Sequence, residues 1–283
     1  MTSLRKLQLT ELNILKKAVA VFDEMKIPYV ALGGTLLGAV RHGGFIPWDD
    51  DIDLGIPREY YDEFIEKGKS VFNEESGMVL KNFKIDSGYK YYFSRITDKS
   101  VKVKDGSALI EKEQDAWIDI FPIDGMPKGR IKMKIHKFRL LFARMAFQYS
   151  QFSTLVSVNL PDRPWYERIL IKLGKILPVE KMFSVDKSLL RLDKLLHKYP
   201  YEKSFYAVNF MGAGKFKEMH ERSVYDNRAE YKFEDTEIYG VKDYDKWLRK
   251  MYGDYTVLPP EEKRNKHFTE VIGCENEGEK NNA

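Results

Sequence analysis

A chain of 283 residues with 43% hydrophobic and 32% charged residues can bury a full core, and this composition excludes disordered and fibrous proteins. The net charge of +4 is too small to predict a nucleic-acid partner, and the single Cys274 excludes an intrachain disulfide or a cysteine-based zinc site. Neither a signal-peptide pattern nor an apolar run of about 18 residues is found, which predicts a cytoplasmic protein.

The N-terminal third predicts alternating helices and strands. Apolar residues at helical spacing predict a helix over residues 10–25, with Thr10 as its N-cap. A buried strand over 29–32 then leads to the pair Gly33-Gly34. We expect a short helix over 35–41 whose N-terminus faces whatever the two glycines hold.

An acidic row follows these glycines. We expect a strand over 49–56, in which Asp49, Asp51 and Asp53 share one face and Asp50 points to the other face in a structural role. Adjacent negative charges repel, a cost that a bound cation would offset, and oxygen ligands suit Mg²⁺ or Mn²⁺. The alternative is a solvated acidic turn, which fits the interleaved apolar residues less well.

The next segments extend this pattern. Pro57 predicts the start of a helix, and we expect strands over 78–83, 89–97, 100–104 and 116–120. The first 125 residues therefore predict an α/β or α+β unit.

Asp119 lies between Ile118 and Ile120, where a charge is unexpected unless it faces a site. The alternative is a strand-edge residue on a solvated face. Together with Asp51 and Asp53, Asp119 could hold one or two divalent ions that stabilise a transferring phosphoryl group. The nearby Asp124 could equally belong to a turn.

The composition changes after Pro127. No acidic residue occurs from there to Pro161, and basic residues alternate with apolar ones over 128–144. This segment is either an amphipathic surface for anionic lipid or a helix with a solvated basic face. Helical patterns follow over 163–177, 185–198 and 244–252, with another helix start at Pro259-Pro260, and a frayed polar tail is expected from Glu275.

Three segments together resemble the LicD family over nearly the whole chain. They are the run from Gly33 to Asp53, the segment Asp119-Ile120-Phe121-Pro122, and the stretch from Tyr252-Gly253-Asp254-Tyr255 to His267. The resemblance implies an α+β fold with a nucleotidyltransferase-like mixed sheet core, flanking helices and a largely helical C-terminal half. We accordingly expect a catalytic core over 1–125, a helical region over 126–274, and a flexible tail over 275–283.

The resemblance also implies a metal-dependent transferase that moves phosphocholine from CDP-choline to a sugar hydroxyl of a teichoic acid or lipopolysaccharide precursor, releasing CMP. It implies that Asp51, Asp53 and Asp119 are catalytic and bind Mg²⁺ or Mn²⁺, with Asp49 as a supporting ligand. The residues expected to bind substrate are Gly33, Gly34, Thr35, Arg41, His42, Arg95, Arg264 and His267.

Alternatives remain open at this point. Each basic residue could be a solvated surface charge, and Trp48 and Trp117, which could hold choline, could instead pack in the core. The enzyme could transfer a nucleotide or another phosphoalcohol. The chain could also be an inactive ligand-binding or membrane-adaptor homologue. A lipid-linked glycan acceptor would place the protein peripherally at the inner face of the plasma membrane.

Overall fold

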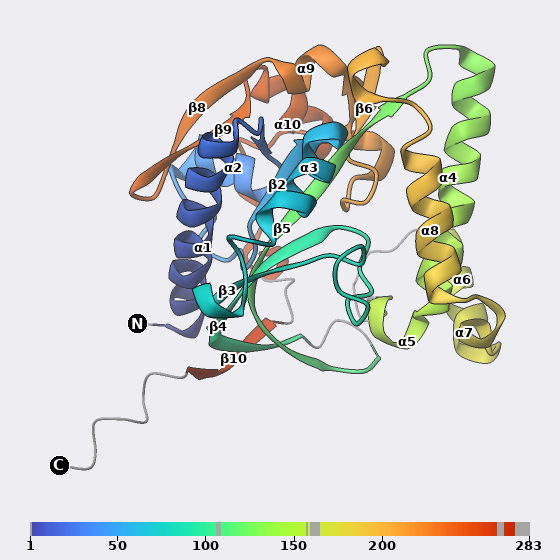
Figure 1. Ribbon diagram of the computed structural model, residues 1–283, viewed down its shortest axis with the longest axis horizontal. Coiled ribbons are helices and arrows are strands. Elements are labelled where there is room, and N and C mark those ends of the chain that lie inside the picture. The colour runs from blue at the N-terminus through green and yellow to red at the C-terminus, as the bar shows by residue number, and fades with distance from the viewer. Residues whose placement is uncertain (1, 106–108, 157, 159–164, 265–268, 275–283) are drawn as a thin grey trace.

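The computed structural model describes residues 2–105, 109–156, 158, 165–264 and 269–274 (Figure 1). The predicted tail over 275–283 and the expected substrate-binding residue His267 lie outside the described residues. In the described chain, helices are interspersed with the strands of a mixed sheet, which confirms the predicted mixed sheet with flanking helices.

The strands of the described chain are β1 (Val30–Ala31), β2 (Asp53–Pro57), β3 (Met78–Lys81), β4 (Ser94–Asp105), β5 (Lys112–Met126), β6 (Tyr206–Val208), β7 (Met219–Glu221), β8 (Arg228–Phe233), β9 (Thr236–Val241) and β10 (Thr269–Cys274). The main path of the sheet follows the order β10-β4-β5-β2-β1-β9-β8. β3 pairs with β4, and β6 pairs with both β5 and β7. β2 runs parallel to β5, and β1 runs parallel to β9.

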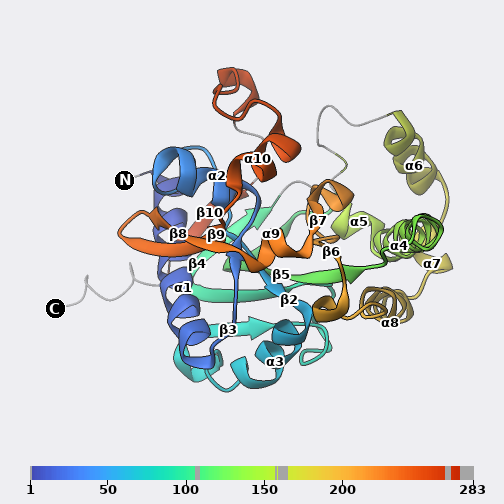
Figure 2. The same ribbon diagram turned by 90° about the horizontal axis from the view of Figure 1, so that it is seen from above.

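The α-helices of the described chain are α1 (Ser3–Met25), α2 (Gly33–His42), α3 (Arg58–Gly68), α4 (Arg130–Ser150), α5 (Phe152–Leu155), α6 (Trp165–Ile176), α7 (Val179–Met182), α8 (Val185–Leu196), α9 (Arg222–Asp226) and α10 (Tyr244–Tyr252). Figure 2 shows α3 and α10 on opposite sides of the strands. Helices α4 to α8 gather at one end of the molecule (Figure 1). The helices predicted over 163–177, 185–198 and 244–252 are confirmed as α6, α8 and α10.

Helix α1 begins earlier than its apolar spacing predicted. Its N-cap is Thr2, whose side chain accepts a hydrogen bond from the Arg5 N–H, so Thr10 is not the cap. Thr10 is buried inside the helix, where its hydroxyl donates to the Lys6 carbonyl. The extra turns are stabilised because Leu7 packs against β4 and β5 residues in a small core cluster.

The acidic row is only partly a strand, so the prediction of a strand over 49–56 is wrong in its first half. β2 begins at Asp53, and the residues before it form a turn in which the Asp49 N–H donates to the Ile46 carbonyl at 2.9 Å. The buried Gln8 of α1 holds this turn, because its amide donates to the Asp49 carbonyl at 2.9 Å.

The strands expected over 89–97 and 100–104 are one long strand, β4, which begins at Ser94. A bulge between Asp98 and Lys102 in its pairing with β5 accounts for the interrupted pattern. The residues just before β4 form turns instead of a strand, and the buried Asn82 amide ties them to β4 through the Ser94 hydroxyl at 2.9 Å.

The C-terminal half is not largely helical, which corrects our expectation. It contributes the strands β6 to β10, and the β8–β9 hairpin extends the sheet where Ala31 of β1 pairs with Gly240 of β9. The physical reason is that β1 and β4 would otherwise leave rows of unpaired backbone groups at their free edges. Segments distant in sequence supply the missing partners, with β10 pairing along β4.

Asp124 is a strand residue and not a turn residue. It lies in β5 with only 1% of its surface exposed, and its two carboxylate oxygens accept hydrogen bonds from the Arg58 guanidinium at 2.6 and 3.0 Å. The pair fastens the start of α3 to the centre of the sheet. Pro57 forms the N-cap of that helix, close to the predicted helix start.

We expect Asp124→Asn to lower the free energy of unfolding by about 3 kcal/mol or more, because the substitution leaves the buried Arg58 charge without its carboxylate. The measurement is urea denaturation. The matched control is Glu63→Gln, which breaks an exposed pair with Lys67 and should cost about 0.5 kcal/mol or less. Equal losses in the two variants would contradict a structural role for the buried pair.

Candidate active site

Two carboxylates lie side by side at the centre of the sheet. Asp53 of β2 is the register partner of Asp119 of β5, and Arg95 of β4 is the register partner of Asp119 on its other side. Residues in register on adjacent strands point to the same face, so two negative charges and one positive charge form a row. Burial raises the pKa of Asp53 well above its ordinary value, and the neighbouring Asp51 and Asp119 raise it further.

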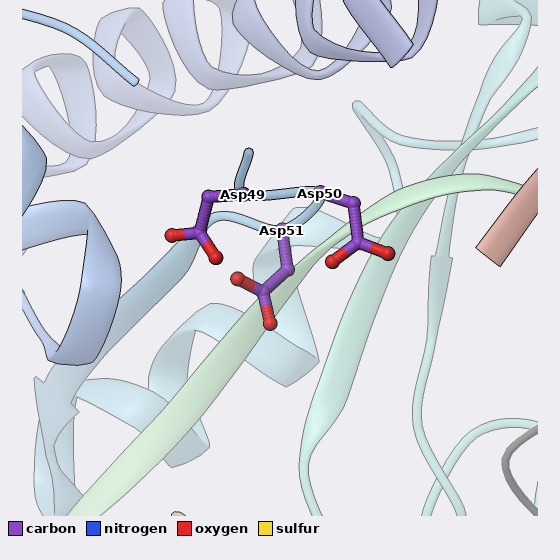
Figure 3. Close-up of side chains that lie close together, drawn as sticks. All are labelled: Asp49, Asp50 and Asp51. Carbon is purple, nitrogen blue, oxygen red and sulfur yellow. The ribbon is translucent and has the colours of Figure 1, made fainter. Parts of the chain in front are cut away.

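The loop before β2 adds three more carboxylates. Asp49, Asp50 and Asp51 each present an oxygen, and these oxygens lie within 4.8 Å of one another (Figure 3). Asp50, which we expected to point away in a structural role, is therefore part of this cluster. The alternating faces of an extended strand do not apply here, because these residues precede β2.

The glycine pair lies directly against these carboxylates. Gly33 has a positive φ of 51°, and a Cβ at this residue would stand 3.0 Å from an Asp53 carboxylate oxygen. A Cβ on Gly34 would stand 2.3 Å from an Asp49 carboxylate oxygen, closer than any real contact. The glycines therefore leave room for the acidic side chains at the N-terminus of α2.

Thr35 holds Asp53 from the same helix. It is buried, and its hydroxyl accepts a hydrogen bond from the Asp53 N–H at 2.8 Å. This hydrogen bond joins Thr35 to the main chain of Asp53. Thr35 is therefore a positioning residue in this structure.

Arg95 is the partner of Asp119. Its Nε donates to Asp119 Oδ1 at 2.7 Å, and Nη1 donates to Gln114 at 2.9 Å. The guanidinium also lies 4.2 Å from the centre of the Trp117 ring. Arg95 and Trp117 form part of the wall of a cavity of about 490 Å³, so an open space adjoins the residue that holds Asp119.

The two tryptophans considered for choline are both stacked by arginines. Arg264 lies 4.8 Å from the centre of the Trp48 ring, as Arg95 does over Trp117. Those ring faces are already occupied by cations. His42 approaches Trp48 edge-on, and burial followed by the charge of Arg41 lowers the pKa of His42.

The C-terminal segment closes on the N-terminal motif. Arg41 of α2 donates to the Tyr255 carbonyl at 2.7 Å, and Arg264 donates to the Pro259 carbonyl at 2.8 Å. The Tyr252 hydroxyl is the next side-chain group met by a Cβ on Gly33, at 3.9 Å. The structure therefore brings together the described parts of the three segments that carry the family resemblance.

Two residues next to the carboxylates were not among the predicted site residues, although Tyr252 belongs to the C-terminal segment of the family resemblance. Glu11 of α1 is 1% exposed, and its pKa is raised well above the ordinary value by burial and then by Asp51 and Asp50. Burial also raises the pKa of Tyr252, with Asp53 as the next cause. Glu11 lies four residues after Leu7 and four before Leu15, both of which are buried. A charged residue at this spacing in a helix was the sequence signal that could have identified Glu11 as a site residue.

The carboxylate cluster fits a divalent cation. Oxygen-only donors within 4.8 Å of one another suit Mg²⁺ or Mn²⁺, and the two glycines keep the space around Asp49 and Asp53 clear of side chains. The cluster at Asp49, Asp50 and Asp51 could hold the ion, with Asp53 and Asp119 next to it.

Known proteins are similar to this chain in sequence. The profile of the LicD/FKTN/FKRP nucleotidyltransferase domain family matches residues 26–159. The chain is 30% identical over 272 residues to the lipopolysaccharide cholinephosphotransferase LicD of Haemophilus influenzae, and the match covers 94% of this chain and 96% of that protein. It is 42% identical over 62 residues to the human ribitol 5-phosphate transferase FKRP, a match that covers 22% of this chain and 12% of FKRP.

We expect Gly34→Ala to weaken Mn²⁺ binding by about 10- to 100-fold, as loss of ligand positioning does, because the new Cβ displaces the Asp49 carboxylate. Stability should not fall, since alanine favours a helix. Isothermal titration calorimetry with Mn²⁺ and thermal unfolding measure the two effects. Gly129→Ala is the control, because its Cβ would meet only Lys132 at 3.9 Å or more. Unchanged Mn²⁺ affinity in Gly34→Ala would remove Asp49 from the site.

Proposed function

Because the chain belongs to the LicD family and is a transferase of that family, we propose that it transfers phosphocholine from CDP-choline to a sugar hydroxyl of a cell-surface glycan precursor. CMP is the other product. The similarity to a lipopolysaccharide cholinephosphotransferase over nearly both whole chains supports this donor and this class of acceptor. An acceptor of the teichoic acid or lipopolysaccharide type follows from the same similarity.

The observation that carries the proposal is the concentration of carboxylates around the N-terminus of α2. Asp53 and Asp119 are register partners, and Asp49, Asp50 and Asp51 cluster beside them. Such repulsion is costly in a folded protein unless a positively charged group binds among the side chains. An inactive homologue would gain nothing from a cluster of repelling carboxylates. The cluster therefore favours an active enzyme over an inactive homologue.

A divalent cation at the cluster of Asp49, Asp50 and Asp51, with Asp53 and Asp119 next to it, would neutralise the diphosphate and polarise the phosphoryl group. The chain's own residues then have the remaining tasks. Asp53 is kept in place by the Thr35 hydroxyl on its main chain, and Asp119 by Arg95 on its carboxylate. Fixed positions reduce the reorganisation needed when charge develops during transfer.

The reaction is a substitution at the phosphorus that bears choline. The acceptor hydroxyl oxygen bonds to that phosphorus, the bond from phosphorus to the bridging diphosphate oxygen breaks, and CMP leaves with the electron pair. We assign the hydroxyl proton to the Asp119 carboxylate. Burial raises the pKa of Asp119, with Arg95 opposing that rise, so the group is suited to accept a proton.

We propose that Arg41, His42, Arg95 and Arg264 bind the donor's diphosphate, the three arginines through their charge and His42, whose pKa is lowered by burial and by Arg41, through a ring N–H. Arg41 lies in the last turn of α2 and donates to the Tyr255 carbonyl, Arg264 stacks on Trp48, and Arg95 borders the cavity beside Asp119. We include His267 among the residues proposed to bind the donor on the basis of the family resemblance alone.

We expect Asp51→Asn and Asp53→Asn each to reduce CMP release from CDP-choline by about 10²- to 10³-fold, the effect of removing one strong electrostatic contact from a transition state. Asp53→Asn should not destabilise the fold, because its pKa is raised in the folded protein and its charge therefore opposes folding at neutral pH. Asp235→Asn, an exposed partner of Lys16, is the control. Full activity in either site variant would refute the assignment.

The donor distinguishes the remaining alternatives. With free hexoses and N-acetylhexosamines as acceptors, we expect CMP from CDP-choline and no pyrophosphate from CTP, because attack occurs at the phosphorus that bears choline. Product analysis by chromatography and mass spectrometry measures both. Pyrophosphate from CTP would indicate nucleotide transfer, and CMP from CDP-ribitol alone would indicate the reaction named for FKRP.

A further inference from the structure

Helix α4 is apolar on two opposite faces. Leu140 and Phe147 pack into a core cluster with α8, which covers one face. Ile131 and Phe138 each lie nine residues before one of these, two and a half helical turns away, and therefore on the opposite face. That second face is open, since Ile131 is 75% and Phe138 is 71% exposed. A protein that stays in water does not favour such a stripe.

The open stripe is continuous along the helix. Ile131, Ile135, Phe138 and Phe142 follow one another at spacings of four, three and four residues, so they line one side of α4. All four are exposed large apolar side chains. Their spacing is that of a helix that binds along its length, and not of isolated surface residues.

A second exposed stripe lies on the neighbouring helix α6. Trp165 is 73% and Ile176 is 69% exposed, and Ile169 and Leu173 continue the stripe between them. The Tyr149 hydroxyl of α4 donates to the Leu170 carbonyl of α6 at 2.9 Å, and both views show the two helices at the same end of the molecule (Figures 1 and 2).

Basic side chains border the α4 stripe on both sides. Lys132 and Arg139 are on one flank and Lys134 is on the other, and all three are exposed. The structure shows no ion pair between these three side chains and any described residue. No Asp or Glu occurs between Asp124 and Asp162, so nothing local neutralises the flanks.

We propose that the exposed face of α4, with the neighbouring stripe of α6, docks on an anionic lipid membrane. Apolar side chains inserted below the headgroups, with lysine and arginine at headgroup level, are the features of an interfacial helix. In the described part of the chain, no helix is long and apolar enough to cross a membrane. The proposal explains the exposed apolar side chains and the one-sided charge together.

A second copy of the chain fits this face less well. In a two-fold dimer the same patch meets itself, so the basic flanks would face basic flanks across the contact. Lysine is also depleted in protein interfaces. Anionic lipid supplies the opposite charge and the apolar interior in one partner. The docked orientation would present the enzyme to a lipid-linked acceptor, a consequence that rests on the proposed function, whereas the docking itself does not.

Vesicle co-sedimentation tests the docking without any activity measurement. The vesicles are phosphatidylcholine alone and phosphatidylcholine mixed with phosphatidylglycerol. We expect the protein to bind the mixed vesicles at low salt and to bind them more weakly at high salt. It should not bind the vesicles of phosphatidylcholine alone. Equal binding to both vesicles, or none to either, would overturn the proposal.

Variants separate the two contributions. Ile131→Ser combined with Phe138→Ser should reduce binding to the mixed vesicles by about 10-fold or more through lost apolar insertion. Lys132→Glu combined with Arg139→Glu should remove the salt dependence. Ile272→Ser, an exposed apolar side chain of β10, is the control and should bind as the wild type. Circular dichroism confirms that each variant is folded.

Self-association is measured in parallel by analytical ultracentrifugation without lipid. A monomer whose vesicle binding is lost in the α4 variants supports membrane docking. A dimer that the Ile131→Ser, Phe138→Ser variant dissociates, together with unchanged vesicle binding by that variant, would assign the face to a second copy and overturn the proposal.

Discussion

Repulsion between carboxylates on neighbouring strands is the constraint around which this structure is arranged. Parallel pairing of β2 with β5 puts Asp53 beside Asp119, and the preceding loop adds Asp49, Asp50 and Asp51. The fold opposes this repulsion with one cation in register, Arg95, whose guanidinium holds Asp119. We propose that a metal-bound diphosphate offsets part of the remaining negative charge when it binds among these carboxylates.

The surrounding elements hold this cluster in place from three directions. Gln8 of α1 binds the main chain of the acidic turn, Thr35 of α2 binds the main chain of Asp53, and Arg41 ties α2 to the C-terminal segment. The glycine pair has a role that spacing did not reveal. It makes room for the carboxylates themselves, because a Cβ on either glycine would meet an acidic oxygen.

Much of the site could be predicted from the sequence, because its residues occur in short motifs whose chemistry is local. The acidic row, Asp119 and the C-terminal segment were all found there. Glu11 was missed because the helix prediction over residues 10–25 used only the spacing of its apolar residues. The burial and neighbouring charges that raise its pKa depend on a loop about forty residues away in sequence. The strands of the C-terminal half were missed because a strand is stabilised by partners distant in sequence.

The sequence by itself indicated the longer helices, the family, and the residue types gathered in the candidate site, since periodicity and short motifs depend on nearest neighbours along the chain. The tertiary structure alone decided that Asp49, Asp50 and Asp51 form a turn instead of a strand, that Arg95 faces Asp119, and that β8, β9 and β10 complete the sheet. It also decided that one apolar face of α4 remains exposed. These outcomes depend on which backbone edges and side-chain faces meet in space, and that is set by pairing and burial between segments distant in sequence.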